Sequence, residues 1–559
     1  MNAEPSAIRH WPWLAAIASG GLLAWSFPPA DQGWLAWFAL TPLVCAVWFG
    51  GKPLAFGVWR LKFGVPADRS GTVETPNAKG LRSAALGYVA GLTFFTATFG
   101  WLGELAPLFA NPWLRALPLL LALYLGLYLA FWAWFLAWIK PPDFLRPGRN
   151  LACGTLVAAA WVAQEWVRGW LFSGFGWNAL GVALHGDLAM IQIVAFTGVP
   201  GLSWLVAFGN AMAVLVVRRL LGDIGPHFLR RMRWEFSATV ALVALVWAYG
   251  ARTLLRGDAP AGDVLRVAAI QANIPQREKF DPAQEEEIFA RFDRLTGLAL
   301  ALRPEPQLIV WPESATPRPL FGDQANHDFV FAQAGRSDAA LLLGTTDLDA
   351  LGDDYNVAVL LTDRGEHLQM YRKMHLVPFG EYLPLRPLLG PIAGGLVPGD
   401  FAPGRSFTQF EMGPPTVRLS TLICFEDTLS ALSRGFVLEG AQILVNITND
   451  GWFARSAAAR QHLVNAIFRA VENRRPLLRC ANTGVTGLVQ RTGFFEQWIP
   501  EFEEGIAVRE ITVPREAPTT FFTRHGDLVS PVSAGAVALG LALGGWRRRA
   551  AVANSPVRA

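Results

Sequence analysis

A single cysteine at the end of an apolar segment is the residue of this sequence best suited to nucleophilic chemistry. Apolar and β-branched residues run through 417–423 to Cys424, and acidic residues and a short helical pattern follow. This order predicts a thiol where a buried strand meets a helix N-terminus. Backbone N–H groups and the helix dipole favour the nucleophilic thiolate there. The alternative is that Cys424 is a small buried hydrophobe, the usual role of a lone cysteine in an apolar strand.

Two further motifs place charged residues at predicted strand ends. The hydrophobic segment 309–312 ends at Glu313, and the segment 371–384 carries Lys373 and Glu381. Taken one at a time, a glutamate or lysine at a strand end is ordinarily a solvated surface residue. Their combination with Cys424 makes all three motifs candidates for one site.

The elements that must position these residues are those of a soluble α/β domain. Helices are predicted at 284–300, where Ile288, Phe292, Leu295 and Ala299 form one apolar stripe, and at 458–472. Strands are predicted at 265–271, 308–311, 340–344, 357–362, 417–424, 443–447, 477–480 and 506–511. This alternation predicts a layered α/β sandwich.

The composition indicates a membrane protein. The chain has 559 residues, of which 52% are hydrophobic and 16% charged, with 23 Trp, and its mean hydropathy is +0.30. These values are too apolar for an ordinary soluble chain. The net charge of +4 does not indicate nucleic-acid binding, because the basic residues cluster beside apolar runs rather than between stacking aromatics.

Long apolar runs predict about eight membrane helices, each near the ~20 residues that a bilayer requires. The runs span residues 13–27, 34–49, 84–102, 117–139, 151–171, 193–217, 236–254 and 529–546. Basic residues are concentrated in alternate loops, which predicts cytoplasmic termini by the positive-inside rule. The chain is therefore expected to contain a membrane domain at 1–256 with about seven helices, a domain outside the cytoplasm at 257–528, and a terminal helix with a basic tail at 529–559.

Cysteine and histidine usage predicts neither a disulfide framework nor a metal centre. Four cysteines are too few for a framework, and two of them fall inside apolar runs. Free thiols are therefore expected. The eight histidines show no ligand-like spacing, and no glycine-rich phosphate loop precedes a helix. We expect no metal and no cofactor.

The three motifs, in this order, resemble the Glu–Lys–Cys triad of the nitrilase, or carbon–nitrogen hydrolase, superfamily. Membrane helices followed by such a domain and one terminal helix resemble the layout of the bacterial apolipoprotein N-acyltransferase family. The matching segments are 165–172, 271–276, 377–384, 446–453, 461–463, 474–476 and 480–486. One departure is Phe280, where the family often has Trp, and an aromatic ring is retained.

The resemblance implies a role for each residue of the site. Glu313 is expected to act as the general base and Cys424 as the nucleophile. Lys373 and a backbone N–H near Phe425 are expected to stabilise the oxyanion. Glu381 and Glu426 are expected to hold Lys373 and keep it charged, and the alternative for both carboxylates is ordinary surface solvation.

The resemblance also implies the substrates and the location. The acyl donor is expected to be a membrane phospholipid, attacked by the cysteine to give an acyl-thioester. The acceptor is expected to be the free α-amine of the diacylglyceryl-cysteine of an apolipoprotein, in a ping-pong reaction without ATP or metal. The protein is expected to be a monomer of the bacterial inner membrane, with its catalytic domain on the periplasmic side.

Residues that contact lipid are harder to place from sequence. We expect them among the aromatic residues of the motifs and the ionisable pair of the fifth apolar run: Phe280, Trp311, Tyr382, Trp452, Glu165 and Arg168. For Glu165 and Arg168 the alternative is a structural pair. The apolar loop 383–399 is expected to form a mobile lid that dips toward lipid, or else to pack on its own domain. The polar insert 51–82 is assigned no function.

Three other readings remain open at this point. The protein could be a membrane-tethered amidase of the nitrilase type that acts on a small amide, although about seven helices exceed what an anchor needs. It could be a transporter with an appended binding domain, but no internal repeat is evident. Cys424 could also pair with His375 instead of Lys373. Comparing the activities of variants substituted at these three residues would distinguish the two pairs.

Overall fold

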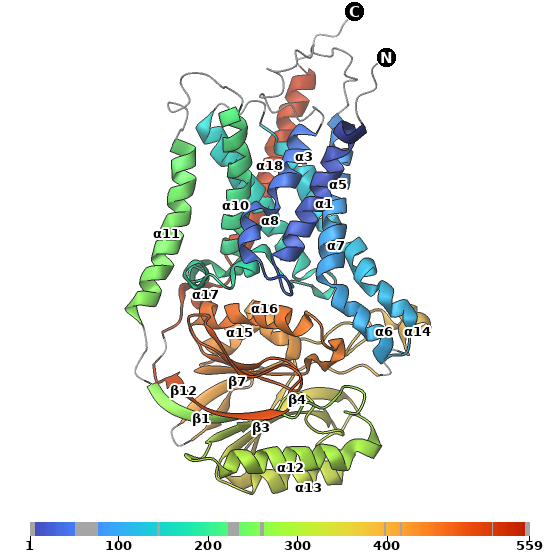
Figure 1. The fold of residues 1–559 in the computed structure, drawn as a ribbon, viewed down its shortest axis with the longest axis vertical. Coiled ribbons are helices and arrows are strands. Elements are labelled where there is room, and N and C mark those ends of the chain that lie inside the picture. The colour runs from blue at the N-terminus through green and yellow to red at the C-terminus, as the bar shows by residue number, and fades with distance from the viewer. Residues whose placement is uncertain are drawn as a thin grey trace, which may run out of the picture. The chain divides into compact units, whose positions relative to one another are not determined.

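The computed structural model describes residues 6–50, 76–141, 146–221, 234–257, 262–395, 399–413, 416–516 and 518–553 (Figure 1). The chain forms two compact units. The first unit contains Met1–Gly100, Ala116–Arg252 and Asp527–Ala559, and the second contains Trp101–Arg115 and Thr253–Gly526. The terminal segment thus groups with the N-terminal helices, whereas residues 101–115 group with the α/β domain.

The first unit is helical, and all eight predicted apolar runs are largely helical in it or at its edge. Its main helices are α1 (Ser6–Trp25), α2 (Ala36–Ala39), α3 (Thr41–Phe49), α5 (Pro76–Thr98), α7 (Leu117–Ile139), α8 (Pro147–Arg168), α9 (Leu188–Ile191), α10 (Val194–Leu221), α11 (Trp234–Arg256) and α18 (Val529–Ala553). The run at 34–49 is not one helix. Pro42 stands in the first turn of α3, where proline starts a helix rather than continuing one.

Three helices of the described chain are long and apolar enough to cross a membrane, or four if one bent pair counts as a span. They are Pro112–Ile139, Val194–Arg218 and Trp234–Arg256, and the bent pair is Ala78–Thr98 with Gly100–Leu108. The stretches Gly33–Phe49 and Val529–Gly545 are shorter apolar helices. These helices fit a membrane protein, and the number of about eight spans stays a prediction.

Small residues let α5 and α7 approach closely. A Cβ added to Gly91 would lie 2.7 Å from Gly126 Cα, and one added to Gly87 would lie 2.3 Å from the Leu129 carbonyl oxygen. Gly87 and Gly91 are one helical turn apart on α5, the small-xxx-small spacing typical of packed membrane helices.

Several sequence predictions concern residues outside the described chain. They include 51–75 of the polar insert, the basic cluster in 222–233, residues 396–398 of the predicted lid and the last residues of the basic tail, 554–559.

The second unit contains two six-stranded sheets. In one, the order is β12-β1-β2-β3-β4-β5, and in the other it is β11-β10-β9-β8-β7-β6. The strands are β1 (Gly262–Gln271), β2 (Leu308–Val310), β3 (Ala340–Leu348), β4 (Asp354–Thr362), β5 (His367–Arg372), β6 (Phe410–Met412), β7 (Val417–Ile423), β8 (Ile443–Thr448), β9 (Leu477–Ala481), β10 (Thr486–Val489), β11 (Phe495–Ile499) and β12 (Gly505–Pro514).

Helices cover the outer faces of the stacked sheets, so the predicted α/β sandwich is confirmed (Figure 1). One face is covered by α12 (Glu285–Ala301) and α13 (Gln324–Ala334), and the other by α15 (Ser430–Leu438) and α16 (Ala458–Asn473). The unit also contains α14 (Arg386–Ala393) and α17 (Phe521–His525). The Cys480 thiol of β9 lies 3.4 Å from the Ile270 carbonyl oxygen of β1. This contact shows how closely the two sheets stack.

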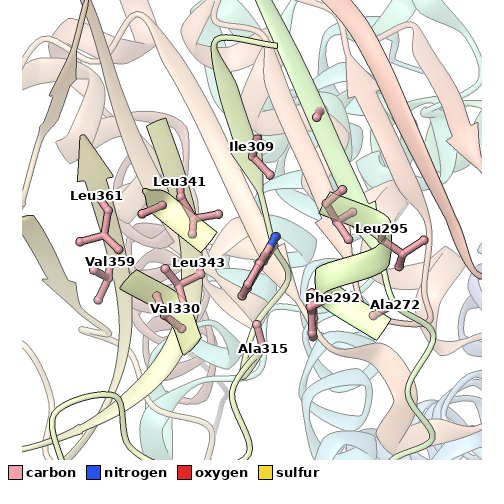
Figure 2. Packing of buried hydrophobic residues seen from close by; sticks show 14 of the residues in the cluster. Ala272, Phe292, Leu295, Ile309, Ala315, Val330, Leu341, Leu343, Val359 and Leu361 are labelled. Atoms are coloured by element: carbon pink, nitrogen blue, oxygen red, sulfur yellow. The ribbon is translucent and has the colours of Figure 1, made fainter. Parts of the chain in front are cut away.

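The core on one side of the sandwich lies between the first sheet and α12 and α13. The predicted stripe Ile288, Phe292, Leu295 and Ala299 is buried there, which confirms it. Figure 2 shows Phe292 and Leu295 facing the same cluster as Ile309 and Leu341 of the strands. Because this core holds β2 and β3 in place, it also fixes the loops that follow them.

Candidate active site

Three strand ends of the second unit carry the predicted catalytic residues. Glu313 follows β2 and Lys373 follows β5 in one sheet, and Cys424 follows β7 in the other. Lys373 Nζ lies 3.7 Å from Glu313 Oε1, and after burial the charges of these two side chains act most strongly on the pKa of the Cys424 thiol. The structure therefore brings together three residues that lie far apart in the sequence.

The Glu313 carboxylate is held by two donors from different strands. Asn356 Nδ2 donates to Oε1 at 3.0 Å, and the backbone N–H of Asn449 donates to Oε2 at 3.0 Å. The buried Lys279 Nζ donates to the Glu313 carbonyl oxygen at 3.0 Å. A Cβ on Gly344 of β3 would lie 2.7 Å from Glu313 Cα, so glycine is needed for this approach. Glu313 is thus fixed at both its backbone and its carboxylate.

Lys373 is a buried cation paired with Glu381. Its side chain is 1% exposed, and Nζ lies 2.8 Å from Glu381 Oε1. Burial by itself lowers the pKa of Lys373, but the Glu381 and Glu313 carboxylates outweigh burial and raise that pKa above its ordinary value. Glu381 also accepts hydrogen bonds from Asn356 Nδ2 and the Val377 N–H, each at 2.8 Å. The predicted role of Glu381 in holding Lys373 agrees with this geometry.

Cys424 sits in a tight turn with a left-handed backbone, φ 52°. The residue as a whole is half-buried, and its carbonyl oxygen accepts a hydrogen bond of 3.0 Å from Asn446 Nδ2. Burial, and then the Glu313 carboxylate, raise the pKa of the Cys424 thiol well above its ordinary value, whereas Lys373 lowers it. These two effects oppose the thiolate that a helix N-terminus was expected to favour. The α-helix expected directly after Cys424 does not begin there, because a 3₁₀ turn follows Cys424 and α15 begins at Ser430. The dipole of an α-helix therefore does not act directly at the thiol.

Glu426 has a different set of partners from those expected. Its Oε1 accepts from the Tyr371 hydroxyl at 2.8 Å and from the N–H groups of Met374 and His375 at 2.8 and 3.0 Å. Its Oε2 accepts from the Ile423 N–H at 2.8 Å. Burial raises the pKa of Glu426 to about 7, against the lowering effect of Lys373. Glu426 thus ties the backbone after Lys373 to the backbone before Cys424, rather than bonding the Lys373 ammonium.

Sequence reasoning missed three residues that contact Glu313. Asn449 lies in the segment 446–453 that resembles the family, which is a signal that could have pointed to it. Lys279 directly precedes Phe280, the position where this sequence departs from the family. Asn356 lies inside β4 with no motif around it, so only the fold identifies it.

The aromatic residues expected to contact lipid lie in different environments. Phe280 is 49% exposed, Tyr382 is partly exposed, and Trp452 stacks on Phe109 with ring centroids 6.3 Å apart. Trp311 is fully buried and stacks on Phe292 of α12 at 4.5 Å. The prediction that Trp311 contacts lipid is wrong, because its ring fills the core between sheet and helix.

Glu165 and Arg168 lie at the end of α8 in the first unit. Glu165 Oε1 accepts from Trp161 Nε1 and from the Leu180 N–H, each at 2.7 Å. Arg168 Nη1 donates to the Trp177 carbonyl oxygen at 3.0 Å. Both side chains line a small cavity of this unit. Their contact with lipid stays a prediction.

The surroundings of His375 do not favour a cysteine–histidine pair with Cys424. Its ring stacks on Phe425 with centroids 5.9 Å apart. Burial and the Lys373 charge lower the pKa of His375. The charge of Lys373 acts on the pKa of the Cys424 thiol, which favours Lys373 over His375 as the partner of the thiol.

The residues that the structure describes contain no group of three or more His, Cys, Asp or Glu side chains that could hold a metal ion. The four cysteines are free.

Comparison with known proteins covers nearly the whole chain. The family model described as apolipoprotein N-acyltransferase N-terminal domain matches residues 19–212, and the carbon–nitrogen hydrolase model matches residues 266–519. An apolipoprotein N-acyltransferase of Geobacter metallireducens is 32% identical over 532 residues, which cover 93% of each chain. The chain belongs to the apolipoprotein N-acyltransferase family.

Other relatives with this name match a similar share of the chain. One from Pseudomonas aeruginosa is 32% identical and covers 91% of this chain and 92% of its own. One from Rhodopseudomonas palustris is 30% identical and covers 93% of this chain and 96% of its own. Since both parts of the chain are matched, the helical unit and the sandwich belong to one family architecture.

Proposed function

We propose that this protein transfers a fatty acyl chain from a membrane phospholipid, through a thioester on Cys424, to the α-amine of the diacylglyceryl-cysteine of apolipoproteins. Family membership supports lipoprotein N-acylation. The single observation that supports the mechanism is the grouping of the Glu313 carboxylate and the Lys373 ammonium around the thiol of the half-buried Cys424.

In the first half-reaction, Glu313 takes the proton of the neutral thiol as sulfur attacks the ester carbonyl carbon. Burial and the Glu313 carboxylate raise the pKa of Cys424, so a base that removes the thiol proton during the attack assists the reaction. The C–O bond to the glycerol then breaks, the proton passes from Glu313 to the leaving oxygen, and a lysophospholipid departs. An acyl-thioester remains on Cys424.

Lys373 stabilises the oxyanion of the tetrahedral intermediate. Its charge is fixed in place by Glu381, so little reorganisation is needed when the negative charge develops. The Phe425 N–H is the proposed second donor. Such a preorganised donor contributes ~3 kcal/mol or more to lowering the barrier.

In the second half-reaction, the lipoprotein amine attacks the thioester carbonyl and Glu313 removes its proton. The C–S bond breaks, the thiol is re-formed with that proton, and the amide product leaves. A thioester reacts with amines more readily than an oxygen ester does, so one difficult transfer becomes two easier ones.

Both substrates carry acyl chains, which explains a catalytic domain joined to membrane helices. We assign the membrane part to residues 1–256 and 529–559 and the catalytic part to 257–528, on the periplasmic side of a bacterial inner membrane. The loop at 383–399 carries exposed Leu385 and Leu388, 71% and 69%, which support a lid that contacts lipid.

The decisive experiment is intact-protein mass spectrometry after incubation with a defined phospholipid. An adduct of one acyl group is expected on the wild type and is expected to be absent from Cys424→Ala and greatly slowed in Lys373→Ala. An acyl adduct on Cys424→Ala would contradict the proposal. Hydrolysis of a small amide without any phospholipid adduct would instead favour a membrane-tethered amidase, the activity class that the carbon–nitrogen hydrolase match also allows.

A further inference from the structure

Four buried charged side chains form a closed ring behind the nucleophile. His462 Nε2 lies 2.7 Å from Asp427 Oδ1, and its Nδ1 lies 2.8 Å from Asp450 Oδ1. Arg479 Nη1 lies 2.6 Å from Asp427 Oδ2, and its Nη2 lies 2.9 Å from Asp450 Oδ2. Each cation therefore bridges both carboxylates, and each carboxylate oxygen has one cationic partner.

This geometry favours a doubly protonated imidazole. Both ring nitrogens of His462 face carboxylate oxygens at hydrogen-bond distance, and a proton on each nitrogen lets both donate. Nδ1 also lies 2.9 Å from Arg479 Nη2, a contact that opposes the proton on Nδ1. With His462 charged, the ring holds two positive and two negative groups and is neutral, which is what a buried cluster needs. Burial and Arg479 lower the pKa of His462, but Asp427 and Asp450 outweigh them and raise it to about 9.

The ring joins the turn of the nucleophile to the turn that holds the base. Asp427 lies in the same 3₁₀ turn as Cys424, at Cys424–Thr428. Asp450 directly follows Asn449, whose N–H donates to Glu313 Oε2. Arg479 Nη1 also donates to Asn446 Oδ1 at 2.9 Å, and Asn446 donates in turn to the Cys424 carbonyl oxygen. The relative position of thiol and base thus depends on this ring.

We infer that His462 is a positioning residue, whose imidazolium keeps the Cys424 turn and the Asn449–Glu313 contact in register for acyl transfer. The inference rests on the proposed role of Cys424 as nucleophile. His462 bonds to Asp427 and Asp450, and it acts on the thiol and the base through these two aspartates. Replacing it would leave one oxygen of each aspartate without its cation and let the two turns shift.

The first test separates positioning from folding. His462→Gln is compared with wild type in single-turnover acylation by phospholipid, with amplitude and rate constant measured separately on folded, detergent-solubilised protein. The amplitude per folded molecule is expected to stay near that of wild type, while the rate constant falls about tenfold to a hundredfold, the usual cost of a small misplacement of reacting groups. The matched control is His367→Gln, an exposed histidine on β5, which should change neither quantity.

A normal rate constant in His462→Gln, with only the folded fraction reduced, would overturn the inference and leave His462 a stabilising residue. Failure of the proposed function has a different signature. In that case Cys424→Ala would acquire the adduct, or wild type would acquire none.

The second test is the pH profile of the same rate constant. The charged groups that face His462 are Asp427 from the cysteine turn, Asp450 from the turn after β8 and Arg479 from β9. The wild-type acylation rate is therefore expected to fall as pH rises through about 9. His462→Gln is expected to lack this alkaline decline. A decline of the same size and midpoint in the variant would overturn the inference.

Discussion

At the scale of single residues, the site depends on charges that are buried in pairs. Lys373 remains cationic inside the domain because Glu381 and Glu313 are beside it. The Cys424 thiol remains neutral because burial and the Glu313 carboxylate oppose the thiolate. A neutral nucleophile beside a fixed base is protected from unproductive reactions until an ester enters the site.

Replacing Glu381 by glutamine tests the pairing of the lysine. Glu381→Gln keeps the size of the side chain but removes the charge nearest to Lys373, so the rate of acyl adduct formation should fall about tenfold or more. The free energy of unfolding should also fall by ~1–3 kcal/mol, as it does when other buried hydrogen bonds to charged groups are lost. Mass spectrometry gives the rate, and thermal unfolding gives the stability. The exposed Glu411→Gln on β6 serves as control, and equal rates in the two variants would refute the pairing.

The charge of His462 makes stability pH-dependent. Its pKa in the folded protein is raised from 6.5 to about 9, so the folded state binds the proton more tightly than the unfolded state does. The resulting stabilisation is complete below pH 6.5 and is lost as pH rises through about 9. Thermal unfolding at pH 6.5 and 9.5 should therefore differ more for wild type than for His462→Gln. Equal pH dependence in both proteins would contradict a charged His462.

At the scale of elements, the ends of strands position the chemistry. β2 and β3 run side by side, and the loop after β2 crosses Gly344 of β3 so closely that no Cβ fits. The position of Glu313 is therefore set by a contact between two backbones rather than by a side chain.

Gly344→Ala tests this contact. A Cβ would lie 2.7 Å from Glu313 Cα and 3.0 Å from the Pro312 carbonyl oxygen, which should displace the base and lower the acylation rate about a hundredfold. Overpacking should destabilise the fold by ~1–3 kcal/mol. Gly103→Ala, where nothing lies within 4 Å, is the control. A rate within twofold of wild type, measured by adduct formation, would show that the backbone contact is dispensable.

The helix α14 has an exposed apolar face in the predicted lid. Leu383 is buried at its base, whereas Leu388 is 69% exposed, and Arg386 pairs with Asp400 across the loop. Pro387 stands in the first turn of α14, where proline is tolerated, whereas Pro391 lies inside this helix. The loop is thus tied at its base and apolar at its tip.

Leu388→Asp tests whether this tip contacts lipid. A charge there should slow acylation by phospholipid vesicles severalfold, because placing a charged side chain in the apolar part of a membrane costs free energy. Acylation by a soluble short-chain ester and thermal stability should be unchanged, because the side chain is largely exposed. Leu351→Asp, at a position 88% exposed between β3 and β4, is the matched control. Equal rates with vesicles for both variants would count against a lid.

At the scale of the whole molecule, the helical unit and the sandwich each match a family model. The proposed orientation places the sandwich outside the cytoplasm. In intact spheroplasts, a membrane-impermeant maleimide should label Leu351→Cys in the sandwich but should label Lys79→Cys, in the predicted cytoplasmic loop, only after permeabilisation. The reverse pattern would invert the topology.

Much of the sandwich was predictable because its central elements have strong local patterns. The expected helix at 284–300 is α12 (Glu285–Ala301), and the expected strand at 417–424 is β7 (Val417–Ile423). The strands β5, β6, β10 and β11 were not predicted. They lie at or near sheet edges. There β5 and β11 leave much of their side-chain surface exposed, and β6 and β10 have only three and four residues, so the apolar pattern is weak.

The sequence by itself determined which residues could do chemistry here: a cysteine, a lysine and a glutamate, each at a strand end. Only the tertiary structure decided what surrounds them. The backbone donor to Glu313 is Asn449, 136 positions away, and the cations that bridge Asp427 come from α16 and β9. Local patterns report on the next turn of a helix or strand, whereas buried charges are governed by the stacking of two sheets, which no local pattern encodes.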